Sequence, residues 1–168
     1  MTRLYLMRHG ETVDNARQIM QGQRQGQLNA TGTAQAEAAR DRLADVRFDA
    51  IVASDLRRSI ETAEIMAAPH SLPLTITPLL RERDWGDFTG RYIPDLKGEP
   101  WPPNVESMEH LMARAGEFLD FIRRQWPGGQ VLAVGHGIMN KAIQAVLLNT
   151  LTRHVERMAN AEVRIFDI

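Results

Sequence analysis

Two short apolar runs, far apart in this chain, each end in a histidine. Leu4–Met7 is followed at once by Arg8-His9-Gly10, and Val131–Val134 is followed by Gly135-His136-Gly137. Apolar runs of this length, bounded by polar residues and glycines, are typical of buried strands. Because open parallel sheets bind their ligands at the carboxyl ends of the strands, we expect His9 and His136 to meet in one crevice.

The rest of the chain alternates apolar runs with helical patterns. Apolar residues spaced by three and four predict four helices, three of them beginning at the N-cap candidates Thr31, Ser54 and Ser107 and the fourth following His136. Three further apolar runs are expected to be strands, the last at an edge: residues 50–53, 74–77 and 163–166. This order predicts an α/β fold, a three-layer αβα sandwich with a mainly parallel sheet, in a single domain over residues 1–168.

The segment from Leu79 to Val105 is rich in proline and is expected to be a long loop over one end of the sheet. Long loops in compact domains are usually functional. We therefore expect this loop to help form the binding site.

Composition narrows the class of partner and compartment. The chain has 20 basic and 21 acidic residues, net charge −1, and no cysteine. The basic residues are dispersed, which argues against nucleic acid, and no run of about 18 apolar residues suggests a membrane span. We expect a soluble cytoplasmic protein that uses neither a thiolate metal site nor a disulfide. The oligomeric state is left open.

The residues beside the two histidines suit phosphoryl transfer. An imidazole attacks phosphorus only when the anionic group is held and its charge is offset, which arginine does with paired hydrogen bonds. Arg8 adjoins His9, and Arg57 or Arg58 lies where a helix begins after a strand. The helix that starts at Gly137 adds free N–H groups that attract anions. Together these groups predict a phosphate pocket.

A leaving alkoxide also needs a proton, and Glu82 is the candidate acid. Arg83, next to it, is a candidate to bind a carboxylate or a second phosphate of the substrate. Three or four convergent ligands would be needed for a metal, and neither an H-x-x-x-H motif nor a cysteine pair is present. We therefore predict no metal and no cofactor.

These residues also fit a known family. The chain resembles the histidine phosphatase superfamily, phosphoglycerate mutase-like branch 1, over most of its length. The matching blocks are Arg8 to Thr12 with Asn15, Leu28 to Gly32 with Gln35-Ala36, Ser54 to Arg58 with Glu61 to Ala63, Leu80 to Glu82 with Trp85 to Gly90, and Gly135 to Gly137.

The resemblance implies a role for each matched residue. It implies that His9 is phosphorylated, that His136 stabilises the phosphoryl group, and that Glu82 donates the proton. Arg8 and Arg58 would bind the phosphoryl group, and the family pattern favours Arg58 over Arg57 because it places its arginine before a small residue, here Ser59. Asn15 and Gly137 complete the list of expected substrate-binding residues.

The resemblance leaves more than one activity open. We expect a metal-independent phosphatase that acts on small phosphorylated metabolites through a phosphohistidine. The alternatives are a cofactor-dependent phosphoglycerate mutase, a protein phosphohistidine phosphatase and a non-catalytic phosphate-binding domain. The chain departs from the family pattern in two places. Gln23 or Gln25 stands where an aspartate is expected, which concerns substrate recognition more than catalysis, and the chain lacks a long insert before Ser107, which disfavours a mutase.

Overall fold

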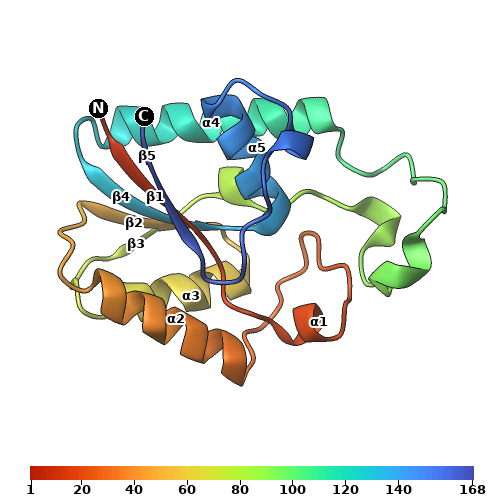
Figure 1. The fold of residues 1–168 in the computed structure, drawn as a ribbon, viewed down its shortest axis with the longest axis horizontal. Helices are drawn as coiled ribbons and strands as arrows, with labels where there is room; N and C mark the ends of the chain where they lie inside the picture. The colour runs from red at the N-terminus through yellow and green to blue at the C-terminus, as the bar shows by residue number, and fades with distance from the viewer.

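The computed structural model describes all 168 residues and contains one five-stranded sheet between two layers of helices (Figure 1). The strands are β1 (Arg3–Arg8), β2 (Ala50–Ala53), β3 (Leu74–Ile76), β4 (Gln130–Gly135) and β5 (Val163–Asp167). The helices are α1 (Val13–Ala16), α2 (Ala30–Leu43), α3 (Arg57–Ala67), α4 (Met108–Gln125) and α5 (Gly137–Leu147). The predicted αβα sandwich is confirmed. None of these helices has the length and apolar character needed to cross a membrane.

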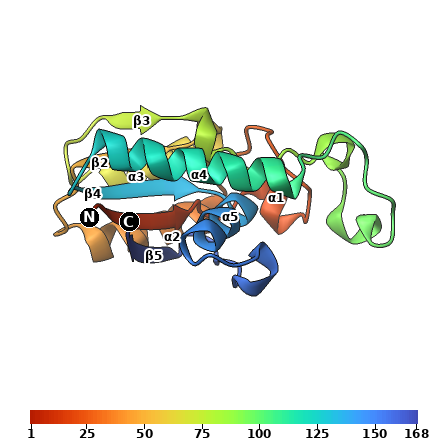
Figure 2. The same cartoon turned by 90° about the horizontal axis from the view of Figure 1, so that it is seen from above.

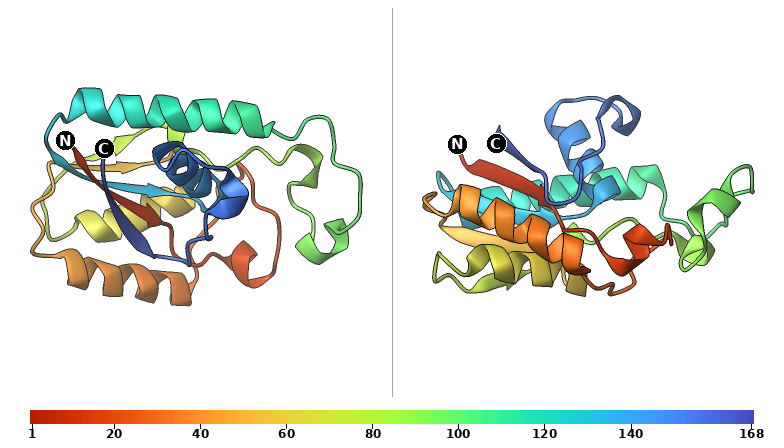
Figure 3. Two further views of the ribbon diagram at one scale, coloured as in Figure 1. Left: turned by 45° about the horizontal axis from the view of Figure 1, so that its top comes forward. Right: turned by 60° about the horizontal axis from the view of Figure 1, so that its bottom comes forward.

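The strand order is β3-β2-β4-β1-β5, and only β5 runs antiparallel to its neighbour. β1 and β4 pair directly although they lie far apart in the sequence, with Arg8 opposite Gly135. This register places His9 and His136 one residue beyond the same edge. Figure 3 shows the two ends of the chain side by side at the other end of β1, where Ile168 and Thr2 pair through their backbones.

Alternation along the central strands builds two cores, one on each face of the sheet. In β1, Leu4 and Leu6 pack under α4 and α5, whereas Tyr5 and Met7 pack against α2 and α3. β2 and β4 divide their residues between the two faces in the same way. Because successive side chains of a strand point to opposite faces, an uninterrupted apolar run is what a strand covered on both sides requires.

Two of the three predicted helix caps are wrong. Asn29, not Thr31, caps α2 by accepting a hydrogen bond from the N–H of Gly32. Leu56 precedes α3 without any side-chain cap, so Ser54 is free for another contact. Ser107 does cap α4, as predicted, through the N–H of His110.

The loops at the carboxyl end of the sheet lie outside the three-layer sandwich. Residues 81–106, which include the 3-10 turns Gly86–Phe88 and Ile93–Leu96, extend beyond the ends of the strands as the green arm in Figures 1 and 2. The loop that contains α1 lies beside this arm and is joined to it by a bridge between Ile19 and Tyr92. The predicted long loop is therefore present, and it projects outward beyond the carboxyl ends of the strands.

Candidate active site

A cavity of about 140 Å³ opens where β1 ends and α5 begins. Six of the eight predicted site residues line it: Arg8, His9, Asn15, Arg58, Glu82 and Gly137. His136 is fully buried beside His9, with ring centroids 5.2 Å apart, and only Arg83 points elsewhere. Residues from four separate segments of the sequence therefore meet at one point.

His9 is held in one tautomer. Its Nδ1 donates to the carbonyl oxygen of Gly10 at 2.6 Å, so in the neutral ring Nε2 carries no proton and has a free lone pair. Gly10 itself permits this turn, because any side chain there would collide with the carbonyl of Gly32. Burial, reinforced by the charges of Arg58 and Arg8, lowers the pKa of His9 well below its usual 6.5. The ring is therefore neutral at physiological pH, with the lone pair of Nε2 available.

His136 is fixed from its other side. Its Nε2 lies 2.7 Å from the hydroxyl of Ser54, which already accepts a hydrogen bond from the N–H of Leu56. Because Nε2 is the only acceptor in the protein for the Ser54 hydroxyl proton, we assign this hydroxyl as the donor, which leaves the proton of His136 on Nδ1. That Nδ1 is buried and has no partner in the protein. Burial, with the charge of Arg58, also lowers the pKa of this ring well below 6.5.

Two buried arginines bring positive charge to the histidines. Arg8 donates through Nη1 to the carbonyl of Met158 at 2.8 Å, and Arg58 donates through Nη2 to the carbonyl of Gly22 at 2.7 Å. In each guanidinium Nε is buried and has no partner. Burial lowers the pKa of both side chains to about 10, so they stay charged at neutral pH. Arg57, the alternative from sequence, instead pairs with Glu61 on the surface.

Glu82 is held at the start of α5. Its carboxylate accepts from the backbone N–H groups of Arg83, Ile138 and Met139 at 2.8, 3.1 and 2.9 Å. The side chain is only 9% exposed yet lines the cavity. Glu82 therefore lines the same cavity as His9, and its role as the proton donor stays a prediction.

The sequence matches a protein family over nearly its whole length. The family is the histidine phosphatase superfamily (branch 1), and the match covers residues 4–168. The chain belongs to this superfamily. No group of three or more histidine, aspartate or glutamate side chains in the protein is arranged to hold a metal ion.

Named relatives agree with this assignment. This histidine phosphatase is 37% identical over 151 residues to an uncharacterized phosphatase, PhoE, of Bacillus subtilis, covering 88% of this chain and 76% of that protein. It is 33% identical over 171 residues to a probable phosphoglycerate mutase, GpmB, of Enterobacter, covering 94% and 79%. A mycobacterial glucosyl-3-phosphoglycerate phosphatase, solved with vanadate, superposes with a TM-score of 0.89 at 30% identity, covering 97% and 91%.

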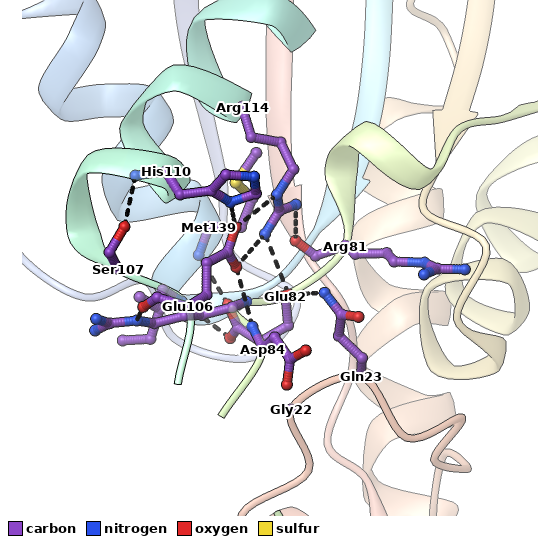
Figure 4. Close-up of polar contacts among 12 residues, drawn as sticks. Gly22, Gln23, Arg81, Glu82, Asp84, Glu106, Ser107, His110, Arg114 and Met139 are labelled. Carbon is purple, nitrogen blue, oxygen red and sulfur yellow. Dashed lines mark hydrogen bonds and ion pairs between the residues drawn. The ribbon is translucent and has the colours of Figure 1, made fainter. Parts of the chain in front are cut away.

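A polar cluster of Glu106, His110 and Arg114 anchors the acid segment, residues 79–82, to α4 (Figure 4). Arg114 donates to the carbonyls of Leu79, Arg81 and Glu82 and pairs with Glu106 at 2.8 Å. Burial raises the pKa of Glu106, but the hydrogen bonds from Arg114, the backbone of Asp84 and His110 outweigh it and hold that pKa low. Because Arg114 holds these three carbonyls in place, the cluster fixes the backbone of Glu82 and so positions the candidate acid.

The structure places Arg83 away from the cavity. Its Nε donates to the carbonyl of Glu106 at 2.8 Å, and its guanidinium lies 4.9 and 5.1 Å from the ring centres of Trp85 and Trp101. Trp85 lines the cavity, but Trp101, which packs edge-on against Trp85, does not. The predicted contact of Arg83 with substrate therefore stays a prediction, and the geometry gives it a packing role in the arm.

Two residues of the site escaped the sequence analysis. Ser54, expected to cap a helix, instead bonds to His136. Arg157 lines the cavity from the segment between α5 and β5 and forms no hydrogen bond or ion pair. A signal for Ser54 was present, since it directly follows β2 at the same edge of the sheet as His9. For Arg157 the sequence offers no periodicity or motif.

Proposed function

We propose that this protein hydrolyses small phosphate monoesters through a phosphohistidine on His9, without a metal ion. One observation carries the proposal: three buried N–H donors without partners, Nε of Arg8, Nε of Arg58 and Nδ1 of His136, belong to the side chains around His9. A buried donor without an acceptor is costly, by about 1–3 kcal/mol each. The three oxygens of a phosphoryl group are acceptors of the right number and charge for them.

The proposed reaction has two steps. Nε2 of His9 attacks phosphorus, the bond from phosphorus to the ester oxygen breaks, and Glu82 in its protonated form gives that oxygen a proton. Water then attacks the phosphohistidine, Glu82 takes the proton from it, and inorganic phosphate leaves with His9 restored. Asn15, whose side-chain Nδ2 donates to no protein group, and the N–H of Gly137 would add hydrogen bonds to the phosphoryl group.

The test is turnover of a generic aryl phosphate in the presence of a chelator, with release of inorganic phosphate as the readout. We expect steady hydrolysis by the wild type and none by His9→Ala. Hydrolysis that stops with the chelator, or that survives in His9→Ala, contradicts the proposal. The apolar part of the cavity wall supports the choice of probe, since Ile19, Ile93 and Ile138 lie on it.

A mutase is the second candidate, favoured by the GpmB relative. A mutase must keep water from the phosphoenzyme, whereas Ile93, which lines this cavity, is 42% exposed. Incubation with 3-phosphoglycerate separates the two activities. Release of phosphate faster than formation of the isomer supports the phosphatase, and the reverse order supports the mutase.

A further inference from the structure

Arg157 stands at the mouth of the cavity with its charge unopposed. Its side chain is exposed, lines the cavity and contacts no carboxylate. Its backbone, in contrast, is fixed, because Val155 and Met158 on either side are buried and the carbonyl of Met158 accepts from Arg8. The guanidinium is therefore delivered to the site by an anchored segment rather than by a free loop.

Arg157 and Arg8 converge on one point. A methyl group on the Cα of Gly137 would lie 3.2 Å from Nε of Arg157 and 3.4 Å from Nε of Arg8. Two neighbouring guanidinium groups repel each other. After burial, the charge of Arg157 is the largest cause of the lowered pKa of Arg8. Such a pair is stabilised when an anion joins it.

The surroundings indicate which anion Arg157 meets. The buried donors of Arg8, Arg58 and His136 already suffice for the transferred phosphoryl group. Glu82 and Arg157 both lie at the start of α5, Glu82 through the N–H groups of Ile138 and Met139 and Arg157 beside Gly137. In the proposed reaction the leaving oxygen is next to Glu82, and the rest of the leaving group extends toward the exposed side of the same cavity, where Arg157 lies.

We propose that Arg157 binds a carboxylate on the leaving group, and that this phosphatase prefers short phosphate esters that carry one. The inference rests on the proposed function for the placement of the ester. The volume of about 140 Å³ suits a small leaving group, and the planar guanidinium matches a carboxylate with two parallel hydrogen bonds.

Two esters that differ only in the carboxylate test the proposal: O-phosphoserine and O-phosphoethanolamine. The variants are Arg157→Met, which keeps an unbranched side chain but removes the guanidinium, and Arg153→Ala as a control, an exposed arginine of the turn Thr152–His154 that does not line the cavity. We expect wild type and Arg153→Ala to show a KM for phosphoserine lower by about 5- to 20-fold than for phosphoethanolamine, and Arg157→Met to show nearly equal values.

Binding gives a readout that does not depend on turnover. The affinities of both esters and of inorganic phosphate are measured by calorimetry in His9→Ala, with and without Arg157→Met. A preference for phosphoserine that disappears with Arg157, while the affinity for inorganic phosphate is unchanged, supports the inference even if the protein turns over neither ester. Equal loss for both esters and phosphate assigns Arg157 to the transferred group and overturns it, as does no change for either ester.

Discussion

The closed end of the cavity and its mouth are built in opposite ways. At the closed end, Arg8, His9 and Arg58 are 7%, 3% and 1% exposed, and each is delivered by the end of a strand or the start of a helix. At the mouth, Ile93 and Arg157 are exposed and come from 3-10 turns or irregular segments. The difference indicates that the closed end determines the chemistry, whereas the mouth determines which ester enters.

Glu82→Gln is the variant with the largest expected effect. Glu82 lies between the closed end of the cavity and its mouth, so this variant tests whether the two have separate roles. The amide keeps the shape but has no acid proton to give. We expect kcat to fall by about 10²–10⁴-fold for alkyl phosphates. Aryl phosphates with acidic leaving groups should be much less affected, since they leave without a proton. Comparison of the two substrate series in stopped assays measures this, and an equal loss for both would show that Glu82 does not act as the acid.

Arg58→Ala tests the closed end, with Arg57→Ala as its neighbour and control. Arg58 is buried with a free Nε, whereas Arg57 makes an exposed pair with Glu61. We expect Arg58→Ala to weaken every ester and inorganic phosphate alike, by roughly 10- to 100-fold. Arg57→Ala should change kcat/KM by less than about twofold. A loss in Arg58→Ala that depends on the leaving group would remove the distinction between the two ends.

Arg114→Met tests the support of the acid segment, with His110→Ala as control. Arg114 pairs with the buried Glu106, while His110 contacts the same carboxylate from a side chain that is 69% exposed. We expect Arg114→Met to lower the free energy of unfolding by about 3 kcal/mol and kcat for alkyl phosphates by about tenfold. His110→Ala should do neither. Urea unfolding and kcat for alkyl phosphates are measured side by side for both variants. A stable Arg114→Met variant with full kcat contradicts a positioning role for Arg114.

The smallest effect concerns pH. Burial holds the pKa values of His9 and His136 well below 6.5 in the folded protein. As the pH falls through about 6.5, the unfolded chain takes up protons at these rings and the folded protein does not, so stability falls with pH; above that range the two rings add no pH dependence. Urea midpoints at about pH 7.5 and about pH 5.5 should show this decline in the wild type and a smaller one in His9→Gln/His136→Gln. Equal declines would place the titrating groups elsewhere.

The sequence predicted the closed end because strand pairing determines it. His9 and His136 follow two apolar runs, and the register of Arg8 with Gly135 brings them together. Arg58 is different, since spacing alone left Arg57 open and only the family pattern separated them. Its burial has a physical cause that the sequence hides: its guanidinium also holds the loop at Gly22.

The mouth was not predictable to the same degree. Arg157 reaches the cavity only because β5 returns antiparallel to β1 and the segment before it pairs at Ala161 with Arg8 and His9. The packing of Arg83 on Trp85 and Trp101 could not be predicted from its position beside Glu82 in the sequence. Adjacent side chains of a non-helical segment diverge, so Glu82 points to α5 while Arg83 points to the tryptophans.

Identification of the phosphorylated residue tests the central claim, a phosphohistidine on His9, most directly. The wild type is mixed with a labelled aryl phosphate, quenched within one turnover and digested, and the modified residue is located by mass spectrometry, with the acid lability of the linkage as a second criterion. We expect a phosphoryl group on His9, labile in acid and absent from His9→Ala. Steady release of phosphate with no label on His9, or with the label on another residue, would contradict it.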